Sequence, residues 1–200
     1  GGCAREWCVR GGMRVDGQTS EETVGRQWDE VDGLVADGGT CVFSRWGSAG
    51  EARKNGVNLY RVNRDGTGLS YLYGRHSHDS VPEANGIQYL QPRKSDSGNL
   101  LVQLRPFESD DYASVLAEVD VEQFVEANLR IDGTEGTGQQ PLVPGVGLDG
   151  QLSLKGSYAS VSPLLDGTNR YLVSWTPCRL REVATDRIVN CTEDRLQSEE

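Results

Sequence analysis

Residues 40–74 constrain the fold more than any other stretch of the sequence. Two runs in it, residues 40–45 and 58–63, are rich in apolar side chains, and the second alternates apolar with polar residues. That period of two is typical of a half-buried strand. Residues 64–68 (RDGTG) indicate a tight turn, because an Asp-Gly pair tolerates the positive φ angles of a hairpin. Residues 69–73 then return as the partner strand, so the stretch predicts a three-stranded antiparallel meander.

The segment Asn58–Leu69 (NLYRVNRDGTGL) resembles the blade motif of TolB-like β-propellers. In that motif an extended strand containing tyrosine and ending in Asn or Asp runs into x-Asp-Gly-Thr/Ser-Gly, in the same order and spacing. Other segments resemble a bacterial group of TolB-like proteins that is related to the propeller part of the hydrazine synthase alpha subunit; these segments are residues 76–80, 88–93, 100–107 and 170–180. The resemblance covers residues 40–180 and implies an all-β propeller fold. It assigns no activity, because propellers host many unrelated functions.

Blade-like units recur three times, at about residues 40–74, 86–121 and 158–190, within a region that extends from residue 39 to residue 200. A propeller ring needs at least four blades of about 40 residues each, so three units leave the ring open. We therefore expect a partial propeller, completed by further blades of the same parent protein or by another subunit. The missing initial methionine favours a fragment of a longer protein.

Three regions fall outside the strand pattern. Residues 1–38 carry weak strand signals, and the run 19–31 is typical of a short helix with Ser20 as its N-cap. A short helix is also expected over residues 121–128, with Asp120 as its cap. Residues 130–156 are rich in Gly, Pro, Thr and Gln, which predicts a long loop inserted between blades.

The five cysteines include two pairs at short spacing, Cys3 with Cys8 and Cys178 with Cys191. If these pairs form disulfides, the first closes a loop in the N-terminal segment and both require an oxidising compartment. The alternative is a set of reduced, mostly buried cysteines. The resemblance to exported propellers favours disulfides and a periplasmic or extracellular location. The sequence contains no Cys-x-x-Cys-His, so it carries no site for covalent attachment of a c-type haem.

The charge balance excludes two classes of partner. The chain has 30 acidic and 20 basic residues, for a net charge of −10. Nucleic-acid binding and docking to anionic lipid both rely on an excess of Lys and Arg, so we expect neither. No apolar run approaches the ~20 residues needed to span a membrane, so we also expect no membrane span.

His76 and His78 are the only histidines, and Asp79 follows them directly. Side chains two residues apart on an extended segment project to the same face. A His-x-His pair with a carboxylate beside it is half of a plausible site for a divalent metal ion. The alternative is a pair of loop histidines that make structural or substrate contacts.

An acidic loop around Asp110, Asp111 and Tyr112 is the other candidate binding loop. Adjacent carboxylates on a loop are typical ligands of calcium in extracellular proteins. The alternative is a solvated loop without a ligand.

These patterns favour a binding or scaffold module for a protein or small ligand over an enzyme. No Gly-x-Ser-x-Gly elbow, phosphate-binding loop or His-Glu-x-x-His motif marks a catalytic centre. One alternative, which the resemblance implies, is the propeller part of a metal- or haem-linked redox enzyme. Another is a hydrolase or lyase that uses His76 or His78 as a base.

Overall fold

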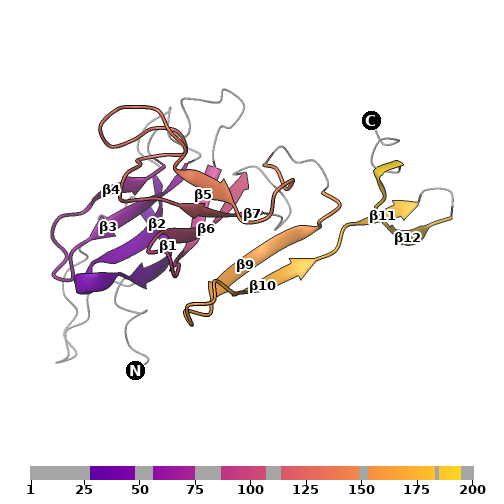
Figure 1. Cartoon of the computed structure of the whole chain (residues 1–200), viewed down its shortest axis with the longest axis horizontal. Helices are drawn as coiled ribbons and strands as arrows, with labels where there is room; N and C mark the ends of the chain where they lie inside the picture. The colour runs from indigo at the N-terminus through magenta and orange to yellow at the C-terminus, as the bar shows by residue number, and fades with distance from the viewer. Residues whose placement is uncertain are drawn as a thin grey trace.

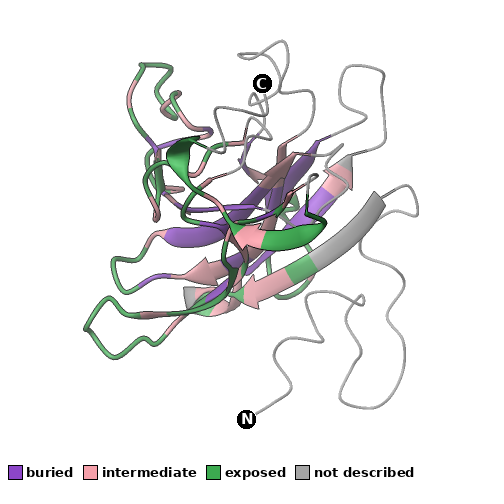
Figure 2. Cartoon of the chain, turned by 90° about the vertical axis from the view of Figure 1, so that its right-hand side faces the viewer, coloured by how far each residue is buried: buried purple, intermediate pink, exposed green. Residues whose placement is uncertain are grey.

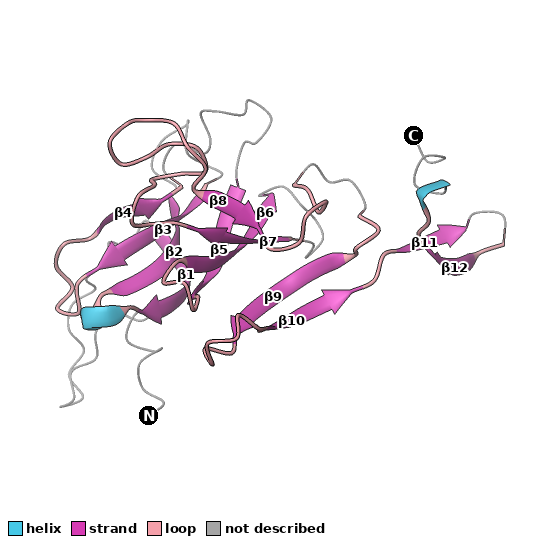
Figure 3. Cartoon of the chain, in the orientation of Figure 1, coloured by secondary structure: helices cyan, strands magenta, loops and turns pink. Residues whose placement is uncertain are grey.

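The computed structural model is described over residues 28–47, 56–74, 87–106, 114–148, 153–182 and 185–194. Within these ranges the regular structure is almost entirely β-strand (Figures 1 and 3). In the described part of the chain, helical structure is limited to a 3-10 turn at Asp37–Gly39 and to residues 193–194. The predicted all-β class is confirmed, and no sheet in the described part closes on itself.

The first four strands form an antiparallel meander in chain order. They are β1 (Trp28–Val35), β2 (Cys41–Gly47), β3 (Val57–Val62) and β4 (Ser70–Tyr73). The last three are the strands that the alternation and the Asp-Gly turn predicted. β1 adds a fourth strand from the segment that showed only weak strand signals.

The helix predicted over residues 19–31 is wrong for residues 28–31, the part of it that the structure describes, because these residues belong to β1. Residues 28–31 pair antiparallel with residues 44–47 of β2 instead. Asp32 has a φ of 50° at a bulge, after which the pairing continues to Val35. Helix propensity is a weak prior, and pairing with a neighbouring strand overrides it here.

The next four strands form a second antiparallel meander. They are β5 (Ile87–Lys94), β6 (Leu100–Pro106), β7 (Val115–Val119) and β8 (Gln139–Pro141). A single parallel pair, Val57 with Gln88, joins the two meanders into one eight-stranded sheet. β8 lies inside the long loop predicted for residues 130–156, so that prediction is wrong for this part.

Pro92 lies in the interior of β5. The pairing of β5 with β6 shifts register between Leu90 and Arg93, and Gln91 has a φ of 51°. A bulge leaves a residue outside the ladder of backbone hydrogen bonds, so proline with its missing N–H is tolerated there.

The helix predicted over residues 121–128 is absent from the structure. The Asp120 carboxylate does cap a turn, accepting hydrogen bonds from the backbone N–H groups of Glu122 (3.0 Å) and Gln123 (3.1 Å). The chain then leaves the helical path, because Phe124 bridges Arg130 instead. The Phe124 ring is buried under the Arg130 guanidinium, and a side chain at Gly138 would overlap that ring.

The main core lies between the two meanders and draws on both. The rings of Tyr73 and Tyr89 meet edge to face with their centroids 5.4 Å apart, and both residues are fully buried. Figure 2 shows the strands at the centre of the molecule as buried and the surrounding loops as exposed. The other members of this core are Val42, Leu59, Leu100, Val102, Leu104, Val115, Ala117, Val119 and Phe124.

Four turns share one pattern of backbone hydrogen bonds, at residues 36–40, 63–67, 95–99 and 130–134. In each, the first N–H donates to the fifth carbonyl and the fourth N–H donates to the first carbonyl, at 2.7–3.2 Å. The fourth position is always a glycine with φ between 82° and 92°. At residues 63–67, 95–99 and 130–134 this is a type I turn followed by a left-handed glycine, a common hairpin closure in which glycine avoids a steric penalty. At residues 36–40 Gly38 also has a positive φ, 76°, as in a type II turn.

Candidate protein-binding surface

A third unit of the chain begins with a two-stranded hairpin, here called the β9–β10 hairpin. It consists of β9 (Ser157–Pro163) and β10 (Tyr171–Thr176), paired antiparallel with Val161 opposite Val173. The two strands begin the blade-like unit predicted at about residues 158–190. Among the described residues β10 pairs with β9 alone, so its outer edge carries no neighbouring strand.

β9 attaches this hairpin to the rest of the protein. Val161 is buried against Leu101 of β6 and Leu116 of β7. Ser114 forms an isolated bridge with Tyr158, and its hydroxyl donates to the Tyr158 carbonyl. β9 is the strand of the hairpin that contacts β5, β6 and β7, so β10 forms the outer strand (Figure 1).

Large apolar side chains of the hairpin are exposed to solvent. Leu172 is 69% exposed and Trp175 is 51% exposed. Single exposed apolar residues are ordinary, but a group of them on one element marks an interaction surface. The remaining members are Leu164, Leu165 and Val173.

Trp175 is held in place although half of its surface is exposed. Its indole N–H donates to the Lys155 carbonyl oxygen at 2.6 Å. Gly156 permits this approach, since a side chain there would overlap the Thr176 carbonyl. An aromatic side chain that is oriented before binding loses little entropy on binding, which is why tryptophan often contributes strongly to interfaces.

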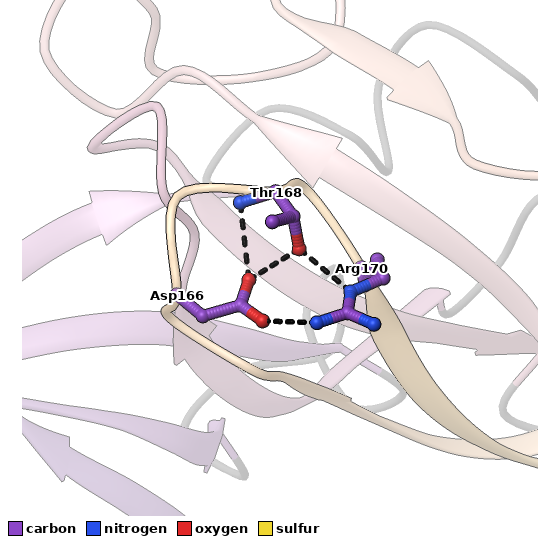
Figure 4. A network of polar contacts seen from close by, with 3 residues as sticks. All are labelled: Asp166, Thr168 and Arg170. Carbon is purple, nitrogen blue, oxygen red and sulfur yellow. Dashed lines mark hydrogen bonds and ion pairs between the residues drawn. The ribbon is translucent and has the colours of Figure 1, made fainter.

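The turn at the end of the hairpin contains a closed polar network (Figure 4). Asp166 forms an ion pair with Arg170 at 2.5 Å and accepts hydrogen bonds from the backbone and side chain of Thr168. The Arg170 Nε also donates to the Thr168 hydroxyl at 2.7 Å. The hydrogen bonds from Thr168 and the ion pair with Arg170 lower the pKa of Asp166 below its ordinary value of 3.8.

The same Asp–Thr contact occurs in two of the four turns described above, at residues 63–67 and 130–134. Asp65 and Asp132 each accept hydrogen bonds from the N–H and the hydroxyl of the threonine two residues later. These bonds lower the pKa of both carboxyl groups. Since the geometry recurs far from the β9–β10 hairpin, we interpret it as a turn-forming contact and not as a ligand site.

A second hairpin ends the described chain, formed by β11 (Arg179–Glu182) and β12 (Arg187–Asn190). A disulfide between Cys178 and Cys191 closes its base with a Cα–Cα distance of 5.5 Å, at one of the two spacings that suggested a bridge. In Figure 1 this hairpin lies at the right-hand end of the molecule. Ile188 on β12 is 69% exposed.

Most of the side chains that the sequence singled out lie outside the described residues. They are His76, His78 and Asp79 of the proposed metal site, Asp110, Asp111 and Tyr112 of the acidic loop, and Cys3 and Cys8. Their assignments remain predictions. Cys41, on β2, is disulfide-bonded. Across the described ranges, no group of three or more His, Cys, Asp or Glu side chains is arranged to hold a metal ion.

Sequence reasoning missed the β9–β10 hairpin as a candidate site. A signal was present, because residues 171–176 form a strand without charge, glycine or proline. Five of its six residues are exposed in the structure, which the sequence alone does not reveal.

In the described part of the chain, no helix has the length and apolarity to cross a membrane. Comparison with known proteins found no matching family model, no matching curated protein and no matching solved structure.

Proposed function

We propose that this protein is an exported TolB-like propeller module that binds a protein partner through the β9–β10 hairpin. The observation that carries the proposal is the outer strand of that hairpin, which is uncharged and rich in exposed apolar side chains. A strand with an open edge offers backbone hydrogen bonds to another strand, and its side chains provide specificity.

The organisation of the strands supports the propeller part of the proposal. Two antiparallel meanders of four strands follow one another in the chain, β1–β4 and β5–β8. Four antiparallel strands are the usual content of a propeller blade. Among the described residues, the third unit consists instead of two separate two-stranded hairpins.

A two-stranded hairpin is only marginally stable by itself in water. The β9–β10 hairpin compensates through the contacts of β9 with the main sheet, but within β10 only Tyr171 packs against the same cluster, and the other five residues are exposed. A partner strand on β10 would bury its apolar side chains and satisfy its outer backbone groups. This energetic benefit is the reason to assign protein binding, instead of small-molecule binding, to this surface.

The location is part of the proposal. Disulfides persist in oxidising compartments, and the structure contains the Cys178–Cys191 bridge. A periplasmic or extracellular site of action therefore fits the chemistry of the chain.

Site-specific photocrosslinking tests the proposed function. A benzophenone amino acid in place of Leu172, in the full chain and in the cells that produce it, should yield a discrete crosslinked protein species. The same amino acid in place of Glu122, which is exposed on the turn after β7, is the matched control and should yield none. Equal crosslinking at both positions, or none at Leu172, would refute binding through the hairpin.

A further inference from the structure

The open edge of β10 lacks the protection that β1 and β8 have at the two ends of the main sheet. Open edges invite pairing with other chains, and proteins usually protect them with charges, prolines, bulges or short length. β1 carries Asp29, Glu30 and a bulge at Asp32, while β8 has three residues and ends in Pro141. β10 has six residues, all uncharged, and the bulge in its pairing with β9 adds a residue to β9 and none to β10.

The side chains of β10 follow a nearly symmetric pattern about Val173. Tyr171 and Trp175 lie two residues on either side of it and share its face, while Leu172 and Ser174 lie on the other face. A strand that pairs antiparallel with its own copy around a two-fold axis needs this self-complementarity. Centred on Val173, such pairing sets Tyr171 opposite Trp175 of the second copy.

We infer that the partner of the β9–β10 hairpin is a second copy of this chain, with the two β10 strands paired antiparallel about Val173. The inference rests on the proposed function and specifies its partner. Val173 then lies opposite Val173 of the second copy, and two aromatic pairs flank this contact. Cross-strand aromatic and β-branched pairs are among the stabilising contacts of sheets.

The resulting sheet has four strands, in the order β9, β10, β10 and β9. This equals the strand number of each meander in the main sheet. Three or more strands are the usual requirement for a stable sheet, so pairing converts a marginal hairpin into a sheet of sufficient size.

The distribution of charge permits a second copy to approach at this edge. The chain has a net charge of −10, so most approaches bring carboxylates together. β10 carries no charge, and Asp166 and Arg170 in the turn before it pair with each other; the carboxylates that act on the strand are Glu118 and Asp96, near Tyr171 at its start. Residues 157–190 carry a net charge of +1, since they contain four arginines against three acidic residues: Arg170, Arg179, Arg181 and Arg187, with Asp166, Glu182 and Asp186.

Sedimentation velocity of the full chain tests this pairing with charged variants at its centre. Wild-type protein should sediment as a dimer at micromolar concentration. Val173→Lys and Val173→Glu should each be monomeric, because like charges meet at the axis. An equimolar mixture of the two variants should recover the dimer, since a lysine then faces a glutamate.

Ile188→Lys is the matched control, because Ile188 is as exposed as Leu172 but lies on β12; this variant should remain dimeric. If circular dichroism shows that a Val173 variant does not fold, a mixture of Leu172→Glu and Ser174→Lys copies replaces it. These positions face each other in the same register, so the mixture should form more dimer than either variant alone.

A monomeric wild type, or charged variants whose mixture fails to recover the dimer, would overturn the self-pairing. That result differs from a failure of the proposed function. A monomer whose Leu172 still crosslinks to a different protein would retain the hairpin as a binding surface with another partner. A monomer without any crosslink at Leu172 would contradict both.

Discussion

Replacing Tyr89 with alanine should lower the free energy of unfolding by about 3–5 kcal/mol, the usual cost of truncating a buried aromatic side chain. Tyr89 is fully buried on β5, and its ring packs edge to face against Tyr73 of β4. The substitution therefore opens a cavity at the contact between the two meanders. Urea denaturation followed by circular dichroism measures the change.

The control for this prediction is Ile131→Ala. Ile131 is 63% exposed in the turn at residues 130–134, so its truncation should change stability by less than about 0.5 kcal/mol. A loss below about 1 kcal/mol for Tyr89→Ala would mean that the two meanders do not share a core at this position.

Replacing Cys178 and Cys191 with serine should destabilise the β11–β12 hairpin by about 3 kcal/mol, because the bridge restricts a loop of roughly a dozen residues in the unfolded chain. The hairpin depends on the bridge, since it has two strands and exposes most of its residues. Amide hydrogen exchange over residues 179–190 should therefore accelerate by roughly 100-fold, as 1.4 kcal/mol corresponds to a factor of ten.

The effect of this substitution should remain local. Residues 100–106 of β6 pair with strands on both sides and contribute to the core, so their exchange should be unchanged. Global acceleration would contradict the assignment of β11–β12 as a separate hairpin. Unchanged exchange at 179–190 would show that the bridge does not hold it.

Local chemistry allowed much of the fold to be predicted. The Asp-Gly turn and its flanking alternation located β3 and β4, because both signals act within a few residues. β1 and β8 were missed for the opposite reason. β1 has acidic residues and a glycine that strands disfavour, and β8 contains only three residues, so the strand character of both comes from pairing with distant segments.

The prediction of a short helix after Asp120 is wrong because tertiary packing overrides the local signal. The cap was correctly identified, and its carboxylate accepts the expected hydrogen bonds. However, burial of Phe124 beneath Arg130 and against Gly138 draws the chain out of the helical path. A capping pattern in sequence indicates where a turn starts and carries no information about where its apolar side chain will be buried.

The candidate site could be predicted only in part. The sequence placed residues 171–176 within a blade-like unit, but the exposure of β10 depends on which strands lie beside it in space. The pattern of residues 171–176 is the same for a strand inside a sheet and for one at its edge. What distinguishes them is the absence of protective residues, which becomes informative once the edge is known.

The central claim is that the outer edge of β10 receives another strand, and amide hydrogen exchange of residues 171–176 at increasing protein concentration tests it most directly. We expect this segment to exchange rapidly in dilute solution and to become protected as the concentration rises. Residues 179–182 of β11 should be unaffected throughout and serve as the internal reference. Rapid exchange at residues 171–176 at every protein concentration, and also when the protein that crosslinks at Leu172 is bound, would contradict the account.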